Sequence, residues 1–364
     1  MMGSGTGSAK QMRLAGLVLI GVLLSALAAW LVAAAQERTR EERFQTEVRR
    51  AEQALIERLR AYEQVLRGGV GLFEASNEVS RSEWRSYFES LELQTRYPGI
   101  LGLGFAQRLR SAELDAHESA IRREGFPDYR VWPRVSGDEH TAIIYLEPFG
   151  EVNRRAFGYD MFAETTRQQA MRRARDTGAV ALSGPVNLVQ DKGSSQQAGV
   201  LMYIPAYRHP LNPDVAGRRE ALLGYVYAPF RISELMEGVF GPATADFGFA
   251  VHDTAAQAPL FRRPALLDAN ADRRLTAVRT ITVYGRTWRL DFVGSRDFAG
   301  DVGIWPFTVF LAGVLITLLL FQVLRAQRLA QERATALAHE MTTAYRESEA
   351  AQRAIVDSSA EGIL

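Results

Sequence analysis

The chain has 364 residues, with 43 Lys and Arg against 42 Asp and Glu, so its formal net charge is +1. This balance excludes a nucleic-acid binder that relies on bulk positive charge. Cysteine is absent, which excludes disulfides, thiolate metal sites and a cysteine nucleophile. With 47% hydrophobic and 23% charged residues, the composition is that of an ordered protein with room for two or three domains.

Two uncharged apolar segments predict membrane-spanning helices, at residues 14–35 and 302–324. Both exceed the roughly 20 residues that a helix needs to cross a bilayer. A cleaved signal peptide is the alternative for the first segment, and a buried core helix is the alternative for the second. Neither segment carries an ionisable residue, which argues against a transporter or channel.

The flanking charges predict the orientation. Residues 1–13 contain Lys10 and Arg13 without an acid, and basic residues are in excess just after residue 324. The flanks at the other ends of the two segments, which adjoin residues 36–301, carry mixed charge. Because positive flanks stay in the cytoplasm, we predict an inner-membrane, two-pass protein with both termini cytoplasmic. Residues 36–301 then form one large periplasmic or extracellular region, which is the plan of a transmembrane receptor.

Residues 36–67 predict one long helix that leaves the membrane as a stalk. Apolar residues recur at spacings of three or four and form one stripe, at Phe44, Val48, Ala51, Leu55, Leu59, Tyr62 and Leu66. We predict that this stripe contacts a second copy in a homodimer. An ordinary surface helix packed on its own domain is the alternative.

Residues 68–301 predict an α+β fold with antiparallel sheets, because short strands alternate irregularly with few helices. Helices are expected at 82–93 and 161–176, and Tyr284-Gly285 marks a hairpin. The length fits two tandem subdomains, one at about 95–230 far from the membrane and one at about 231–301 near it. Strands are expected at 100–107, 129–133, 141–147, 179–182, 186–190, 200–207, 222–228, 247–252, 275–283 and 287–293.

Several separate blocks in this region resemble the CHASE domain, the extracytoplasmic sensor of membrane histidine kinases and nucleotide or diguanylate cyclases. The resemblance covers roughly residues 60–295 and implies a long N-terminal helix followed by two PAS-like subdomains, with the ligand in the distal one. The blocks are Tyr97-Pro98-Gly99, Gly102-Leu103-Gly104-Phe105, Tyr145-Leu146-Glu147-Pro148, Gly158-Tyr159-Asp160-Met161, Leu182-Ser183-Gly184-Pro185-Val186, Tyr203-Ile204-Pro205-Ala206-Tyr207 and Gly224-Tyr225-Val226-Tyr227-Ala228.

The resemblance also implies a ligand site. In the plant cytokinin receptors, an aspartate in the block that matches Asp160 hydrogen-bonds a purine-like ligand, which places ligand contact on Asp160. The implied pocket walls are Leu182, Ile204, Tyr225 and Ala228. The chain departs from that branch at Tyr227 and Pro229, where smaller residues line the pocket, so the location is carried over and the ligand is not. From the residues alone, Asp160 precedes a predicted helix, which favours an N-cap over ligand contact.

The external region contains no catalytic or metal-binding pattern. Its histidines lack a partner at i+4 or a nearby carboxylate cluster, and Gly-x-Ser-x-Gly and a phosphate-binding loop are absent. We therefore predict no cofactor, no metal and a small-molecule ligand of unknown identity. A protein-interaction module without a small molecule is the alternative. A membrane-anchored enzyme is a third possibility, against which the missing nucleophile–base pattern argues.

The C-terminal segment predicts a signalling helix. Residues 325–352 contain heptad-spaced small and apolar residues, which favours a parallel coiled coil in a homodimer over a single solvated helix. His339-Glu340 begins like a histidine kinase phosphoacceptor box but lacks its proline, and the heptads explain the position better. Residues 353–364 resemble the start of a cytoplasmic PAS domain, so the sequence is expected to be truncated before an output domain such as a histidine kinase or diguanylate cyclase.

Overall fold

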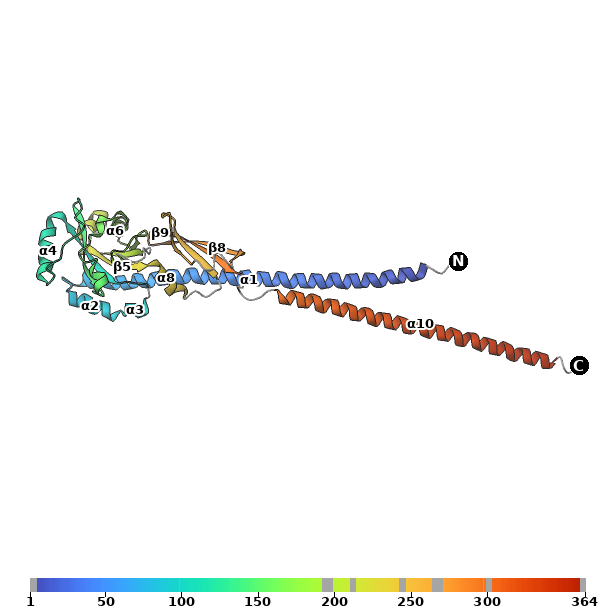
Figure 1. Cartoon of the computed structure of the whole chain (residues 1–364). Helices are drawn as coiled ribbons and strands as arrows, with labels where there is room; N and C mark the ends of the chain where they lie inside the picture. The colour runs from blue at the N-terminus through green and yellow to red at the C-terminus, as the bar shows by residue number, and fades with distance from the viewer. Residues whose placement is uncertain are drawn as a thin grey trace. The chain divides into compact units, whose positions relative to one another are not determined.

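The computed structural model describes residues 5–97, 99–191, 199–209, 214–241, 247–263, 271–296, 298 and 303–360 (Figure 1). The chain divides into two units. One unit combines residues 1–40 with residues 300–364, and the other contains residues 41–299. The last residues of the predicted PAS opening, 361–364, lie outside the described residues.

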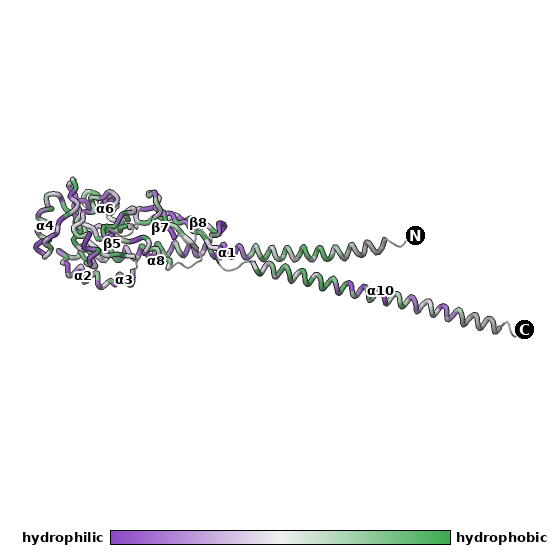
Figure 2. The backbone as a smooth tube through the Cα atoms, in the orientation of Figure 1, coloured by the Kyte–Doolittle hydropathy of each residue, from purple (hydrophilic) through white to green (hydrophobic). Residues whose placement is uncertain are grey.

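The first unit contains the two candidate membrane spans. They belong to α1 (Gly5–Ala75) and α10 (Ile304–Ala360), whose most apolar windows have mean hydropathies of 2.6 and 2.5. Figure 2 shows the apolar stretch of each helix in green. These windows are only 6% and 0% buried within the protein. By length and composition, both helices are therefore able to cross a bilayer.

The second unit contains two antiparallel sheets, which confirms the predicted mixed fold. The five-stranded sheet has the order β2-β1-β5-β4-β3, and the four-stranded sheet has the order β7-β6-β9-β8. The strands are β1 (Leu103–Arg110), β2 (Glu139–Glu147), β3 (Ala181–Leu182), β4 (Gly199–Tyr207), β5 (Leu222–Arg231), β6 (Phe247–Asp253), β7 (Pro259–Arg262), β8 (Ala271–Val283) and β9 (Arg286–Ser295).

Short helices precede, connect and follow the strands of the five-stranded sheet. The α-helices are α2 (Arg81–Ser90), α3 (Leu93–Arg96), α4 (Leu114–Arg123), α5 (Glu151–Arg154), α6 (Thr165–Thr177), α7 (Val215–Ala221) and α8 (Ile232–Phe240). Single 3₁₀ turns are η1 (Ser111–Glu113), η2 (Met161–Ala163) and η3 (Val189–Asp191). The predicted strand at 129–133 is instead a loop with one bridge between Trp132 and Tyr159, and the predicted strand at 186–190 ends in η3.

The part of α1 that belongs to this unit packs along the sheets and corrects one prediction. All seven residues of its apolar stripe are at most 6% exposed, and they join the core formed by both sheets. The Tyr62 ring stacks on Phe230 with centroids 5.0 Å apart. The stripe therefore packs on the chain's own domain, so the predicted assignment of this stripe to a dimer contact was wrong.

The α1 helix also runs beyond its predicted end at residue 67. It continues through Gly68 and Gly69 to Ala75. A side chain at Gly69 would lie 3.1 Å from Val226 and 3.3 Å from Trp84, so glycine allows the helix to approach β5 and α2 closely. Close packing outweighs the low helix propensity of glycine here.

The two faces of the five-stranded sheet pack against different elements. Along β5, Val226 and Ala228 belong to the core on the α1 side, whereas Tyr225 and Tyr227 belong to the core that contains residues of α6. This alternation follows from the two-residue period of a strand. The face toward α6 is therefore lined by tyrosine rings.

Candidate functional site

The five predicted ligand residues are all buried but do not share one face. Asp160, Tyr225 and Ala228 are 0% exposed, and Leu182 and Ile204 are 2% exposed. Leu182, Ile204 and Ala228 lie in the core toward α1, whereas Tyr225 lies in the core toward α6. None of the five lines any of the three cavities described for the chain. Ligand contact by these residues stays a prediction.

Asp160 is occupied by protein donors. Its Oδ1 accepts from the backbone N–H of Thr141 at 2.9 Å and of Phe162 at 3.0 Å, and its Oδ2 lies 2.7 Å from His140 Nδ1. The bond from Phe162 makes Asp160 the N-cap of η2, as the sequence alone allowed. A carboxylate buried in this way ties β2 to the segment that precedes α6.

His140 extends this arrangement to Ser111, whose Oγ lies 3.0 Å from His140 Nε2. A serine, a histidine and an aspartate in this order resemble the nucleophile, base and orienting acid of a hydrolase. Ser111 Oγ, however, donates its proton to the carbonyl oxygen of Gly137. The hydroxyl therefore anchors the loop before β2, and its proton is directed away from the imidazole.

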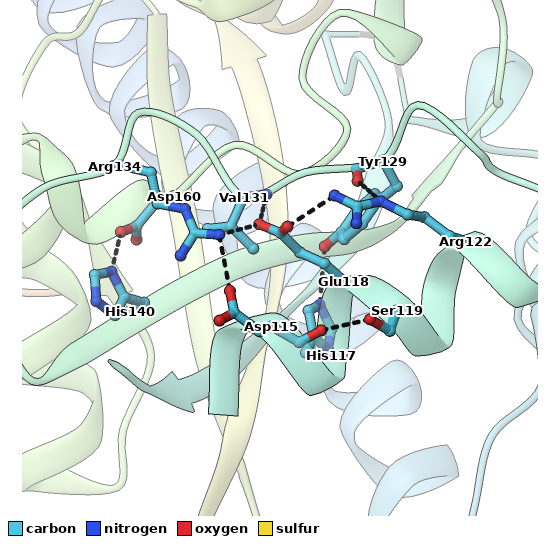
Figure 3. A network of polar contacts seen from close by, with 10 residues as sticks. All are labelled: Asp115, His117, Glu118, Ser119, Arg122, Tyr129, Val131, Arg134, His140 and Asp160. Carbon is cyan, nitrogen blue, oxygen red and sulfur yellow. Dashed lines mark hydrogen bonds and ion pairs between the residues drawn. The ribbon is translucent and has the colours of Figure 1, made fainter. Parts of the chain in front are cut away.

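A second network holds the loop between α4 and β2 (Figure 3). Glu118 of α4 is only 5% exposed. It accepts from the Val131 N–H at 2.9 Å, from Arg122 Nη2 at 2.9 Å and from Arg134 Nη2 at 2.8 Å. Arg122 Nε also donates to the Tyr129 carbonyl at 2.9 Å. Glu118 thus holds the segment from Tyr129 to Arg134 directly at Val131 and Arg134, and through Arg122 at Tyr129.

His117 of α4 contacts the same segment, with its Nε2 2.9 Å from the Tyr129 hydroxyl oxygen, and predicts a pH effect. Burial lowers its pKa from 6.5 to about 4, although Glu118 and Glu124 oppose the shift. A histidine that is harder to protonate in the folded state contributes stability above pH 6.5, which is lost as the pH falls towards 4. We expect the melting temperature to fall less between pH 7.5 and pH 5 in His117→Gln than in the wild type.

Thermal melts of the full chain in nanodiscs at the two pH values measure this difference. His209→Gln is the matched control, because His209 is about half exposed in its side chain and faces Glu74 at 3.6 Å. An equal fall in the wild type and in His117→Gln would contradict the prediction.

A cavity of about 450 Å³, here called the α6 cavity, opens beside α6. Arg167 in its lining is only 3% exposed, and its guanidinium stacks over the Tyr159 ring at 5.0 Å. Its Nη2 donates to the Asn187 carbonyl at 2.9 Å, and Nε lies 3.6 Å from Glu164 Oε2, beyond hydrogen-bond distance. The lining residues are Tyr159, Glu164, Arg167, Pro185, Val186, Asn187 and Val189.

Three buried tyrosines lie on the same side of the sheet as α6. Tyr203 lies 6.2 Å from Tyr225 and 6.3 Å from Tyr227 between ring centroids. None of the three hydroxyls has a hydrogen-bond partner among the described residues. Burial raises the pKa of Tyr203 and of Tyr227, and the nearby Arg167 charge partly opposes this. The group therefore combines neutral hydroxyls with one nearby cation, and none of its three rings lines a described cavity.

Sequence reasoning missed Arg167 and Tyr203. Arg167 shares α6 with the exposed Arg172 and Arg173 and with the buried Arg175, so neither composition nor spacing marks it in the sequence. Tyr203 lies in one of the blocks that resemble the CHASE domain. It pairs with Tyr227 of β5, and Tyr225 lies two positions away on the same face, so tyrosines at alternate strand positions were the signal in the sequence. Within the described residues, no group of three or more His, Asp or Glu side chains is arranged to hold a metal ion.

Two candidate spanning helices and a separate mixed helix-and-sheet unit are consistent with one class of protein, a membrane receptor with an extracytoplasmic sensor. The family model of the CHASE domain matches residues 77–261, just over half of the chain, and this range contains the whole five-stranded sheet. The chain therefore belongs to the CHASE-domain family, as the sequence blocks predicted. No curated protein matches the chain in sequence.

Proposed function

We propose that the chain is the input region of a transmembrane receptor and binds a small molecule beneath α6. The observation that supports this is the group of three buried tyrosine hydroxyls that have no hydrogen-bond partner within the described part of the chain, two of them, Tyr203 and Tyr227, near the buried cation of Arg167. An unsatisfied buried hydroxyl costs about 1–3 kcal/mol, so a ligand that hydrogen-bonds to several of them gains affinity. Tyr225 is the predicted pocket residue that this proposal retains.

The hairpin between β8 and β9 is the proposed relay. Its turn residues, Tyr284 and Gly285, have φ angles of +48° and +83°, as two-residue hairpin turns require. The Gly285 carbonyl accepts from Arg173 Nη1 of α6, and the Tyr284 carbonyl accepts from the Leu182 N–H of β3 at 3.0 Å. The neighbouring Arg286 binds the buried Asp253 of β6 at 2.7 Å. A shift of α6 therefore reaches the second sheet directly.

From the hairpin, β9 leads along the chain towards α10. A ligand that prefers one position of α6 shifts the population of receptor states, and the strand transmits that preference to the second membrane helix. In the single chain, Leu337 and Met341 of α10 are 60% and 67% exposed, which supports a parallel coiled coil with a second copy. A PAS domain and a histidine kinase or diguanylate cyclase would receive the signal.

One observation favours a second candidate, the protein-interaction module. The rings of Tyr203, Tyr225 and Tyr227 occupy the face of the sheet toward α6, and each is at most 1% exposed. If these rings do not move apart, a protein partner on the outer surface is the signal. The two candidates differ in whether a small molecule stabilises the sensor.

The test is a thermal-shift screen of the full chain in nanodiscs against small metabolites, including adenine derivatives and carboxylates. A ligand at about 100 times its Kd stabilises the folded state by about 2.7 kcal/mol. We expect a hit that is lost in Arg167→Gln and kept in Arg154→Gln, which lies on a different cavity. Hydrogen exchange should slow at residues 283–286 as well as in α6 when the hit is bound.

A screen in which no compound raises the melting temperature would favour the protein-interaction module. If every hit keeps its stabilising effect in Arg167→Gln, the proposed site beneath α6 is contradicted.

A further inference from the structure

A second cavity, here called the aromatic cavity, lies between the α4–β2 loop and α5. Its volume is about 560 Å³, within the range of about 300–1,000 Å³ typical of small-molecule sites. It shares no lining residue with the α6 cavity. The lining residues are Gly125, Phe126, Pro127, Asp128, Tyr129, Arg130, Trp132, Phe149, Arg154 and Phe157.

The wall of this cavity is a cluster of aromatic rings. The Phe157 ring lies 5.0 Å from Phe126, 4.7 Å from Tyr129 and 5.3 Å from Phe149 between centroids. Two of these three pairs are edge-to-face. Rings in such an arrangement offer both faces and edges to a further planar ring.

The rings are held in place from behind. The Arg81 guanidinium lies 4.5 Å from the Phe126 centroid and 5.4 Å from the Phe157 centroid, and its Nε binds Glu124 at 2.7 Å. Trp132 Nε1 donates to the Phe157 carbonyl at 2.9 Å. Gly158 has φ +76°, and a side chain there would lie 2.1 Å from the Arg130 carbonyl oxygen, so only glycine lets the two segments approach. A preformed wall lowers the ordering cost of binding.

The charges at the cavity favour an anion. Arg130 and Arg154 are both exposed, and neither guanidinium has a polar partner among the residues that the structure describes. The Arg154 guanidinium lies 5.2 Å from the Phe149 centroid. Asp128 is the single acid in the lining, so the lining carries a net positive charge. A carboxylate binds guanidinium groups through charge-assisted, often bidentate hydrogen bonds.

We propose that the aromatic cavity is a second binding site, for a small planar aromatic carboxylate. The ring packs against Phe126, Phe149 and Phe157, and the carboxylate binds Arg130 and Arg154. The inference does not depend on a ligand beneath α6. The Trp132 carbonyl accepts from the Asp160 N–H at 2.6 Å, so the loop of the aromatic cavity is bonded to the segment that leads into α6. A ligand in the aromatic cavity would therefore act on α6, the same helix on which the ligand proposed beneath α6 acts.

The test is isothermal titration of the full chain in nanodiscs with phenylacetate and indole-3-acetate. Two probes separate the features of the ligand: cyclohexylacetate keeps the charge and lacks the planar ring, and phenethylamine keeps the ring and reverses the charge. We expect binding of the two aromatic acids and weaker or no binding of the other two probes. Arg154→Gln and Arg130→Gln should each raise Kd about tenfold or more, since each removes a charged hydrogen bond.

Two variants make the result specific. Arg123→Gln removes an exposed arginine of α4 outside the cavity lining and should leave Kd unchanged. Arg167→Gln should also leave it unchanged, which separates this site from the one beneath α6. The inference is overturned if neither aromatic acid binds, if the Arg130→Gln, Arg154→Gln double variant binds like the wild type, or if Arg167→Gln alone removes binding.

Discussion

Asp160→Ala is expected to lower the free energy of unfolding of the sensor by about 3–5 kcal/mol, because each buried donor that loses its acceptor costs about 1–3 kcal/mol. The side chain is 0% exposed and satisfies two backbone N–H groups and the His140 ring. Its loss leaves three buried donors without an acceptor. Urea unfolding of the full chain in nanodiscs, followed by tryptophan fluorescence, measures the change.

Two variants test whether burial causes this loss. Asp214→Ala removes another N-cap carboxylate, which binds the Gly217 N–H at 2.6 Å on the exposed helix α7, and should cost about 1 kcal/mol. Asp160→Asn keeps an oxygen for the two N–H groups and should cost less than Asp160→Ala. If Asp160→Ala changes stability by less than the Asp214 variant and instead removes ligand binding, then the role of Asp160 is ligand contact.

Much of the fold was predictable because it depends on local pattern. The apolar segments, the hairpin at Tyr284-Gly285 and most strands follow from length, alternation and turn residues, and the structure forms the corresponding elements. The family blocks predicted the CHASE domain that the family model matches. The segment 129–133 has the residues of a strand, but Glu118 takes the Val131 N–H and replaces a strand partner.

The candidate sites were less predictable because they depend on contacts between distant residues. His140 and Asp160 are twenty positions apart and meet only when β2 lies beside η2. The aromatic cavity draws Phe126, Phe149 and Phe157 from three separate segments. The stripe on α1 shows the same limit, since periodicity predicts an apolar face but does not say which surface covers it.

Glu118→Ala is expected to lower the free energy of unfolding by about 2 kcal/mol, mainly because the N–H of Val131, itself 1% exposed, loses its acceptor. Arg122 and Arg134 have side chains 43% and 51% exposed, so water replaces most of what they lose. The segment from Tyr129 to Arg134 should then exchange its amide hydrogens faster, while amides of β4 and β5 keep their protection after correction for global stability.

Asp115→Ala is the matched control on the same helix. Its side chain is 95% exposed and contacts Arg134 at 3.4 Å, so its loss should change stability by no more than about 0.5 kcal/mol. Glu118→Gln keeps an oxygen for the Val131 N–H and should restore much of the stability. Because the clamped loop carries Tyr129 and Trp132 of the aromatic cavity, Glu118→Ala should also weaken binding of phenylacetate there. Equal loop exchange in Glu118→Ala and Asp115→Ala would show that the buried carboxylate does not hold the loop.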